Sequence, residues 1–143
     1  MSHVSRNHLK LTEEGAKAVM SAAERRAREI GTPMNIAIMD EGGFLLAFSR
    51  MDGAKVSSVR FAIAKARASA IQGKATGPAD GDPTKVMASL AIAITSLANQ
   101  TPLRGGLSLE AEGQCIGAIG VSNGTEDQDV DVARAGAAAL ITK

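Results

Sequence analysis

The spacing of hydrophobic positions changes along this chain, and each change predicts a secondary-structure element. Apolar residues recur at helical spacing over residues 13–30, and Thr12 directly before them is a suitable N-cap. Two apolar runs, 34–40 and 44–50, flank the sequence Glu-Gly-Gly at 41–43. Short apolar runs on either side of glycines are typical of two strands joined by a turn. The first third of the chain is therefore predicted to be a helix followed by a hairpin.

A second helix is predicted from Ser57 or Ser58, either of which could cap it, to about Gln72, with Gly73 at its carboxyl end. Unlike an ordinary surface helix, it has two apolar faces. One face carries Val59, Ala62, Ile63, Ala66 and Ala70, and the opposite face carries Phe61, Ala64 and Ala68. A helix that is apolar on both sides needs cover on both. Contact with another subunit is one way to provide the second cover.

The second half of the chain repeats the order of helix, hairpin and helix. Asp82 and Pro83 form a helix start, and an apolar stripe predicts that this third helix runs to about Asn99. Residues 107–112 alternate and residues 114–121 are apolar on both faces, which predicts a second hairpin. Thr125 with Gln128 forms a capping box for a last helix. Two hairpins separated by helices favour a single α+β domain, residues 1–143, around one antiparallel sheet.

Composition excludes several classes of partner. The chain has 143 residues, and its 16 basic against 15 acidic residues leave a net charge of +1. Nucleic acids and anionic membranes both require clustered positive charge, so we expect neither as a partner. The single cysteine, Cys115, cannot form an internal disulfide, and residues 1–12 contain no apolar stretch typical of a signal peptide. We therefore expect a cytoplasmic protein.

Several charged residues lie where the pattern predicts a turn or burial. Asp40 ends the first strand, and Arg50 ends the second strand, with Asp52 just after it, at the opposite end of the hairpin. These residues either cap turns and lie in solvent or contribute to a site. Lys65 lies between the two apolar faces of the second helix. An ammonium group at this position must pair with a carboxylate, face a cavity, or reach the surface at the end of its flexible side chain.

Arg104 precedes the glycine pair Gly105 and Gly106, and a guanidinium beside free backbone amides can hold a carboxylate. An ordinary loop is the alternative. From Lys65 and Arg104 together we expect a hollow that accepts a negatively charged ligand. The two imidazoles, His3 and His8, both lie in the polar leader, and either could ligate a metal or heme iron.

Six segments together resemble the GlcG/HbpS family, which includes heme-binding secreted proteins, glycolate-operon proteins and the carboxy-terminal domain of PduO-type corrinoid adenosyltransferases. The segments are 36–43 (IAIMDEGG), 50–54 (RMDGA), 58–66 (SVRFAIAKA), 105–106 (GG), 117–122 (GAIGVS) and 128–136 (QDVDVARAG). The match keeps order and spacing over nearly the whole chain. It implies a profilin-like or PAS-like sandwich with a central antiparallel sheet of about five strands, assembled into dimers and commonly octamers. Some members of the family bind heme or iron, and many lie in catabolic operons.

The resemblance also implies a set of site residues, which it places around the cleft between the second helix and the strand ends. Carried over to this chain, they are Asp40, Gly43, Arg50, Asp52, Ser58, Lys65, Gly105, Gly106, Gly120 and Asp129. Of these, Arg50, Ser58, Gly105, Gly106, Gly120 and Asp129, together with Arg104, are expected to bind the ligand.

Two functions remain open at this point. The first is an oligomer that binds heme or another tetrapyrrole, with propionates held by Arg or Lys and iron by a residue such as His8. The second is an isomerase, tautomerase or hydrolytic enzyme of a catabolic pathway that acts on a small carboxylated intermediate. In that enzyme Arg104 holds the carboxylate, and Lys65, Asp52 or Asp40 moves a proton. A structural accessory subunit is a third possibility.

Overall fold

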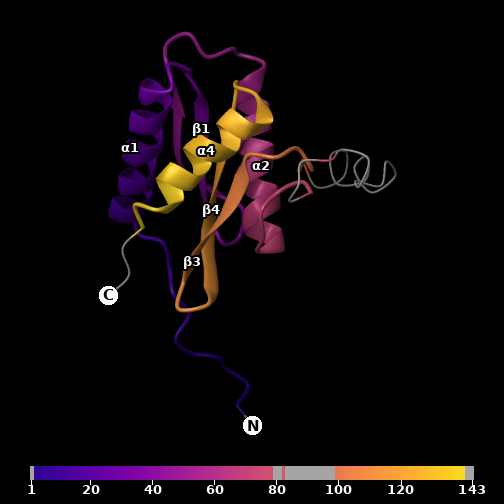
Figure 1. Ribbon diagram of the computed structural model, residues 1–143. Helices are drawn as coiled ribbons and strands as arrows, with labels where there is room; N and C mark the ends of the chain where they lie inside the picture. The colour runs from indigo at the N-terminus through magenta and orange to yellow at the C-terminus, as the bar shows by residue number, and fades with distance from the viewer. Residues whose placement is uncertain (1, 79–81, 83–98, 141–143) are drawn as a thin grey trace.

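The computed structural model describes residues 2–78, 82 and 99–140, which form three helices and two hairpins (Figure 1). In chain order the elements are α1 (Glu13–Glu29), β1 (Asn35–Asp40), β2 (Leu45–Arg50), α2 (Ser58–Gln72), β3 (Gly106–Ala111), β4 (Gln114–Ser122) and α4 (Glu126–Ala137). Each of these elements was predicted from the sequence pattern, with ends that agree within a few residues. The helix predicted after Pro83 lies outside the described residues.

The strands form an antiparallel sheet in the order β2-β1-β4-β3, so the two hairpins meet through β1 and β4 at its centre. Within the described residues the sheet has four strands, not the five or so that the family resemblance implied. Two hairpins supply four strands, which is all that the hydrophobic pattern itself predicted. Figure 1 shows α1 and α4 side by side on one face of the sheet and α2 on the other. The α+β class is confirmed.

The two faces of the sheet are packed differently. Between the sheet and the α1–α4 layer lie large aliphatic side chains such as Ile36, Ile38 and Ile119. Between the sheet and α2 the core consists mainly of alanines, among them Ala62 and Ala66 of α2. Small side chains let α2 approach the sheet closely. A side chain on Gly120 of β4 would collide with the backbone of Ala62 and Ala66. Glycine at this position therefore sets the distance between α2 and the sheet.

Of the four capping signals predicted for these helices, the structure shows three. Thr12 caps α1 by accepting a hydrogen bond from the amide of Gly15, and Thr125 with Gln128 forms the predicted capping box of α4. Gly73 ends α2 in a left-handed conformation. The exception is the start of α2, where the side chain of Ser57 makes no capping hydrogen bond. Within the described ranges, no helix combines the length and the apolar character needed to cross a membrane.

The close approach of α2 predicts that Gly120→Ala destabilises the protein by about 3 kcal/mol, because the added methyl group overpacks a backbone contact that cannot easily relax. Urea unfolding measures this change. Gly42→Ala is the matched control, since Gly42 is exposed and an added methyl group there meets only the tips of neighbouring side chains. We expect the control to cost less than about 1 kcal/mol. Equal losses in the two variants would contradict this account of the packing.

Candidate functional site

Lys65 projects from α2 into the interior and forms a buried ion pair. Its Nζ donates hydrogen bonds to Oδ2 of Asp129 at 2.8 Å and to the carbonyl oxygen of Val121 at 2.9 Å. The Lys65 and Asp129 side chains are only 3% and 4% exposed. The other carboxylate oxygen of Asp129 accepts a hydrogen bond from the amide of Gly124 at 2.9 Å. Both charges are therefore satisfied inside the protein.

This ion pair joins two layers that the sheet otherwise separates. Lys65 belongs to α2 on one face, whereas Asp129 belongs to α4 on the other. The two side chains meet beside Gly105, just before β3 begins. A side chain on Gly105 would lie 2.6 Å from the carbonyl oxygen of Val121 and 3.0 Å from Nζ of Lys65. The backbone of Gly105 also has φ = +123°, which other residues rarely adopt. Gly105 thus leaves the gap through which the pair forms.

Burial dominates the electrostatics of Asp129. Removing the carboxylate from water raises the pKa of Asp129 above its usual value, and the attraction of Lys65 and the hydrogen bonds from Lys65 and Gly124 offset only part of this effect. A buried pair of this kind contributes little net stability compared with apolar packing, but losing one member leaves an uncompensated charge.

The geometry changes the interpretation of Lys65. The sequence left open a carboxylate partner, a cavity or a surface position, and we expected a hollow that takes a negatively charged ligand. The structure instead gives Lys65 an internal carboxylate partner, Asp129, which is 64 residues away in sequence. Lys65 lines neither of the two cavities described next.

Arg104 lines a cavity of about 280 Å³ between three separate parts of the chain. The lining residues come from the segment 74–78, from Arg104, Gly106 and Leu107 before and in β3, and from Val130 and Arg134 of α4. Two of the walls are tied together by Thr76. Its hydroxyl donates to the carbonyl oxygen of Leu103 at 2.6 Å and accepts from the amide of Gly106 at 2.9 Å. Arg104 and Gly106, two of the expected ligand-binding residues, therefore share a cavity.

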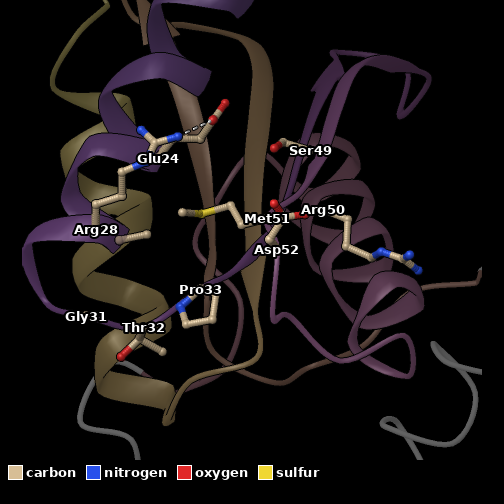
Figure 2. Close-up of a pocket in the computed structure, with 10 residues that line it drawn as sticks. Glu24, Arg28, Gly31, Thr32, Pro33, Ser49, Arg50, Met51 and Asp52 are labelled. Carbon is tan, nitrogen blue, oxygen red and sulfur yellow. Dashed lines mark hydrogen bonds and ion pairs between the residues drawn. The ribbon is translucent and has the colours of Figure 1, made fainter.

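Arg50 and Asp52 lie at a different, more open cavity of about 540 Å³ (Figure 2). The end of β2 forms one wall, and the last turns of α1 with the loop at 31–33 form the other. Glu24 and Arg28 of α1 pair with each other at 3.3 Å. Figure 2 shows Met51 pointing toward this pair and the Arg50 side chain extending away from it. Arg50 and Asp52 thus line a cavity that Lys65 does not line, and the Arg50 side chain points away from the α1 wall of this cavity.

The other expected residues have positions that their local structure explains. Oδ1 of Asp40 accepts hydrogen bonds from the amides of Gly42 and Phe44, both at 2.9 Å, so Asp40 stabilises the β1–β2 turn. Ser58 is a buried residue in the first turn of α2, and Gly120 lies under the middle of that helix. Gly43 faces Arg67 and Ile71 of α2. The expected residues therefore occupy several separate places. One group is close together: Gly120 is paired with Gly106 across the sheet, and Lys65, Arg104, Gly105 and Asp129 lie around them.

His8 lies in the amino-terminal segment, at the end of the molecule that holds the β1–β2 turn. The Gln114 side chain holds the backbone on both sides of it: its oxygen accepts from the amide of Leu9, and its nitrogen donates to the carbonyl oxygen of Asn7, both at 3.1 Å. Lys10 forms an ion pair with Glu41 in the turn. The His8 ring is exposed, and its Nε2 contacts Oγ of Ser5 at 2.7 Å. Among the described residues, no group of three or more metal-ligating side chains is found.

Sequence reasoning missed three residues with defined roles at these places. Lys74 and Arg134 line the cavity with Arg104, and Gln114 holds the segment that carries His8. Lys74 comes just after α2, and Arg134 lies in the last turn of α4. The carboxyl end of a helix is an ordinary place for a cation, so neither residue gives a special signal in the sequence. Gln114 acts on residues more than a hundred positions away, and nothing local in the sequence indicates that contact.

Comparison with known proteins now identifies the family. The family model described as "Haem degrading protein HbpS-like" matches residues 11–138, nearly the whole chain. The chain belongs to the HbpS-like family. Protein GlcG of Escherichia coli strain K12 is 34% identical over 112 residues, which covers 78% of this chain and 81% of GlcG. The resemblance to the GlcG/HbpS family is confirmed.

Solved structures of similar proteins share this fold. Protein ORFY of Klebsiella pneumoniae superposes with a TM-score of 0.86 at 28% identity, covering 98% of this chain and 97% of ORFY. A structure described as a complex of PduOC with heme superposes with a TM-score of 0.81 at 27% identity, covering 92% of this chain and 96% of PduOC. A relative of this chain has thus been seen with heme.

The buried pair predicts that Lys65→Met lowers the free energy of unfolding by about 3–5 kcal/mol, because Asp129 is left without its counterion. Losing the ammonium raises the pKa of Asp129 further. A carboxyl group with a raised pKa in the folded state costs stability as the pH rises through that pKa. The loss of unfolding free energy in Lys65→Met, relative to the wild type, should therefore be larger at about pH 7 than at about pH 5. Urea unfolding at both pH values measures it.

Lys17→Met is the matched control, because Lys17 pairs with Glu13 on the exposed surface of α1. We expect it to cost less than about 1 kcal/mol at either pH. A Lys65→Met variant as stable as this control would show that the buried pair is not needed by the fold.

Proposed function

We propose that this protein binds heme or a related tetrapyrrole, with His8 as an axial ligand of the iron. The observation that carries the proposal is the way in which His8 is held. Gln114 fixes the backbone on both sides of an exposed imidazole, so the ring is accessible while its attachment point is anchored to the β3–β4 turn. Histidine is a common axial ligand of heme iron.

The β1–β2 turn, to which Lys10 ties the segment that carries His8, has features that fit a flat, mostly apolar ligand with acidic groups. Phe44, in the β1–β2 turn, is 73% exposed, and Leu45 beside it is also exposed. An exposed apolar patch of this kind marks a binding surface more often than a scattered apolar residue does. Two cations lie at the same turn: Lys10 pairs with Glu41, and Nε of Arg67 donates to the carbonyl oxygen of Gly43 at 3.2 Å. Such groups can pair with propionates.

The relatives support the same ligand. The description of the family refers to heme degradation, and PduOC is described in complex with heme. In this chain the aromatic contribution is limited to three phenylalanines, so aliphatic side chains would have to supply most of the wall that a tetrapyrrole contacts.

We further propose that the protein assembles with copies of itself through the outer face of α2. Phe61 and Ile71 are about half exposed there, although the opposite face of α2 is packed against the sheet. Strand β2, next to β1 in the sheet, is an edge strand that carries the exposed Leu46. A second copy of this surface would cover both features, in agreement with the dimers and octamers that the family resemblance implies.

The second candidate function is binding of a small anionic ligand or substrate at Arg104, and the cavity at that residue favours it. Its described lining contains no carboxylate, imidazole or thiol group, so the geometry favours binding over acid–base chemistry. Lys65, the expected proton-transfer residue of the enzymatic alternative, is occupied by Asp129. Asp40 is occupied by two backbone amides.

If His8 ligates the iron, titration of the full chain with hemin gives a shifted Soret band, and His8→Ala weakens binding by about tenfold or more and changes the band position. The matched control is His3→Ala, because His3 is the other exposed imidazole of the amino-terminal segment. We expect this control to bind like the wild type.

Two results would count against the proposal. A wild-type protein that leaves the hemin spectrum unchanged would remove heme binding altogether. Binding that survives His8→Ala with the same band position would leave heme as a ligand and remove His8 as its axial ligand.

Self-assembly predicts that Phe61→Ser, on the outer face of α2, lowers the molar mass measured by light scattering during size-exclusion chromatography. The lost apolar contact should weaken association because large apolar side chains dominate such interfaces. Val56→Ser is the control, since Val56 is equally apolar and more exposed but lies outside α2. A wild type that elutes as a monomer of the chain mass would contradict the proposal.

A further inference from the structure

The cavity at Arg104 is surrounded by three cations that come from three different parts of the chain. Lys74 follows the end of α2, Arg104 precedes β3, and Arg134 lies in the last turn of α4. We propose that this cavity binds a small polyanion, a molecule with two or more carboxylate or phosphate groups. The inference rests on the anion site proposed above and adds the charge and the size of its ligand.

Arg104 is held in place before any ligand arrives. Its side chain is only 15% exposed, and Nη1 donates to Oδ1 of Asp127 at 2.8 Å. The stem of Arg104 passes over Gly77, where a side chain would collide with Cγ of Arg104. One guanidinium nitrogen is used by Asp127, and the planar group has further donors for a carboxylate or phosphate. An arginine fixed in this way loses little conformational freedom when it binds.

Lys74 and Arg134 supply positive charge that the protein itself does not neutralise. Within the described residues, neither side chain forms an ion pair, and both residues are exposed. Each lies near the carboxyl end of a helix, where the negative end of the helix dipole favours a cation. The helix dipoles thus offset part of the repulsion between the two cations that face this cavity. An anionic ligand with more than one charge could pair with both cations at once.

The walls limit the size of the ligand. Thr76 ties the segment at 74–78 to the segment before β3 by hydrogen bonds from its amide and its hydroxyl, so this wall is rigid. Leu107 and Val130 give the cavity an apolar part. At about 280 Å³ the cavity lies just below the roughly 300–1,000 Å³ of drug-sized pockets. These features suit a short carbon chain between two anionic groups and exclude a macrocycle.

Isothermal titration calorimetry of the full chain tests the proposal with acetate, succinate and pyrophosphate at matched ionic strength. We expect succinate, pyrophosphate or both to bind at least about tenfold more tightly than acetate, since only they can engage two cations at once. The order of succinate and pyrophosphate tells whether carboxylates or phosphates are preferred. Lys74→Gln and Arg134→Gln should each weaken the tighter ligand by about fivefold or more.

The matched control is Arg25→Gln, because Arg25 is an exposed arginine on α1 that does not line this cavity. We expect its affinity to stay within about twofold of the wild type. A merely structural role for Lys74 and Arg134 would change the melting temperature of the variants and leave their affinity for the anions unchanged. That result would overturn the proposal.

The outcomes separate this inference from the function on which it rests. If acetate binds as tightly as the dianions and only Arg104→Gln abolishes binding, the anion site stands and the polyanion proposal falls. If none of the three anions binds, both fall. Heme binding is tested independently through His8, which is not part of this cavity.

Discussion

The ion pair between Lys65 and Asp129 is the interaction on which the arrangement of this fold depends most. It joins α2 on one face of the sheet to α4 on the other, and it ties both to the carbonyl oxygen of Val121 in β4. The two charges can meet only because Gly105 contributes no side chain at that point. A requirement of charge pairing thus explains a glycine, a buried lysine and a buried aspartate that are far apart in sequence.

The same contact places the residues that are candidates for binding. Gly105 lies against the ion pair, so the backbone on both sides of it is fixed, and this backbone carries Arg104 and the start of β3. Arg104 then faces the cavity between the end of α2 and α4. The ion pair is therefore a support for a cation-lined cavity and not itself the site. The proposed heme surface is separate, at the β1–β2 turn next to His8.

Much of the fold could be predicted from the sequence because its signals are local. The capping box at Thr125, the left-handed Gly73 and the two glycine-turn hairpins each depend on residues within a few positions of one another. Lys65 could also be recognised as unusual, since a lysine between two apolar faces needs a partner. Its partner could not be identified, because nothing local relates α2 to α4.

The candidate sites were less predictable for the same reason. The resemblance to a family grouped Arg50 and Asp52 with Lys65, whereas the cavity that the first two line is bounded by α1 and does not include Lys65. The cavity cations Lys74 and Arg134 look like ordinary residues at helix ends. The support of His8 by Gln114 is a contact between the chain's beginning and its last hairpin, which only the folded structure reveals.

A double-mutant cycle on Lys65 and Asp129 tests the central role of the ion pair most directly. Lys65→Met, Asp129→Leu and the combined variant are compared with the wild type by urea unfolding. If the pair bridges the two layers, each single variant leaves one buried charge without its partner. The loss of unfolding free energy in the combined variant should then be smaller than the sum of the two single losses by about 2 kcal/mol or more. Losses that add to within about 0.5 kcal/mol would show that the two residues act independently and would contradict the account.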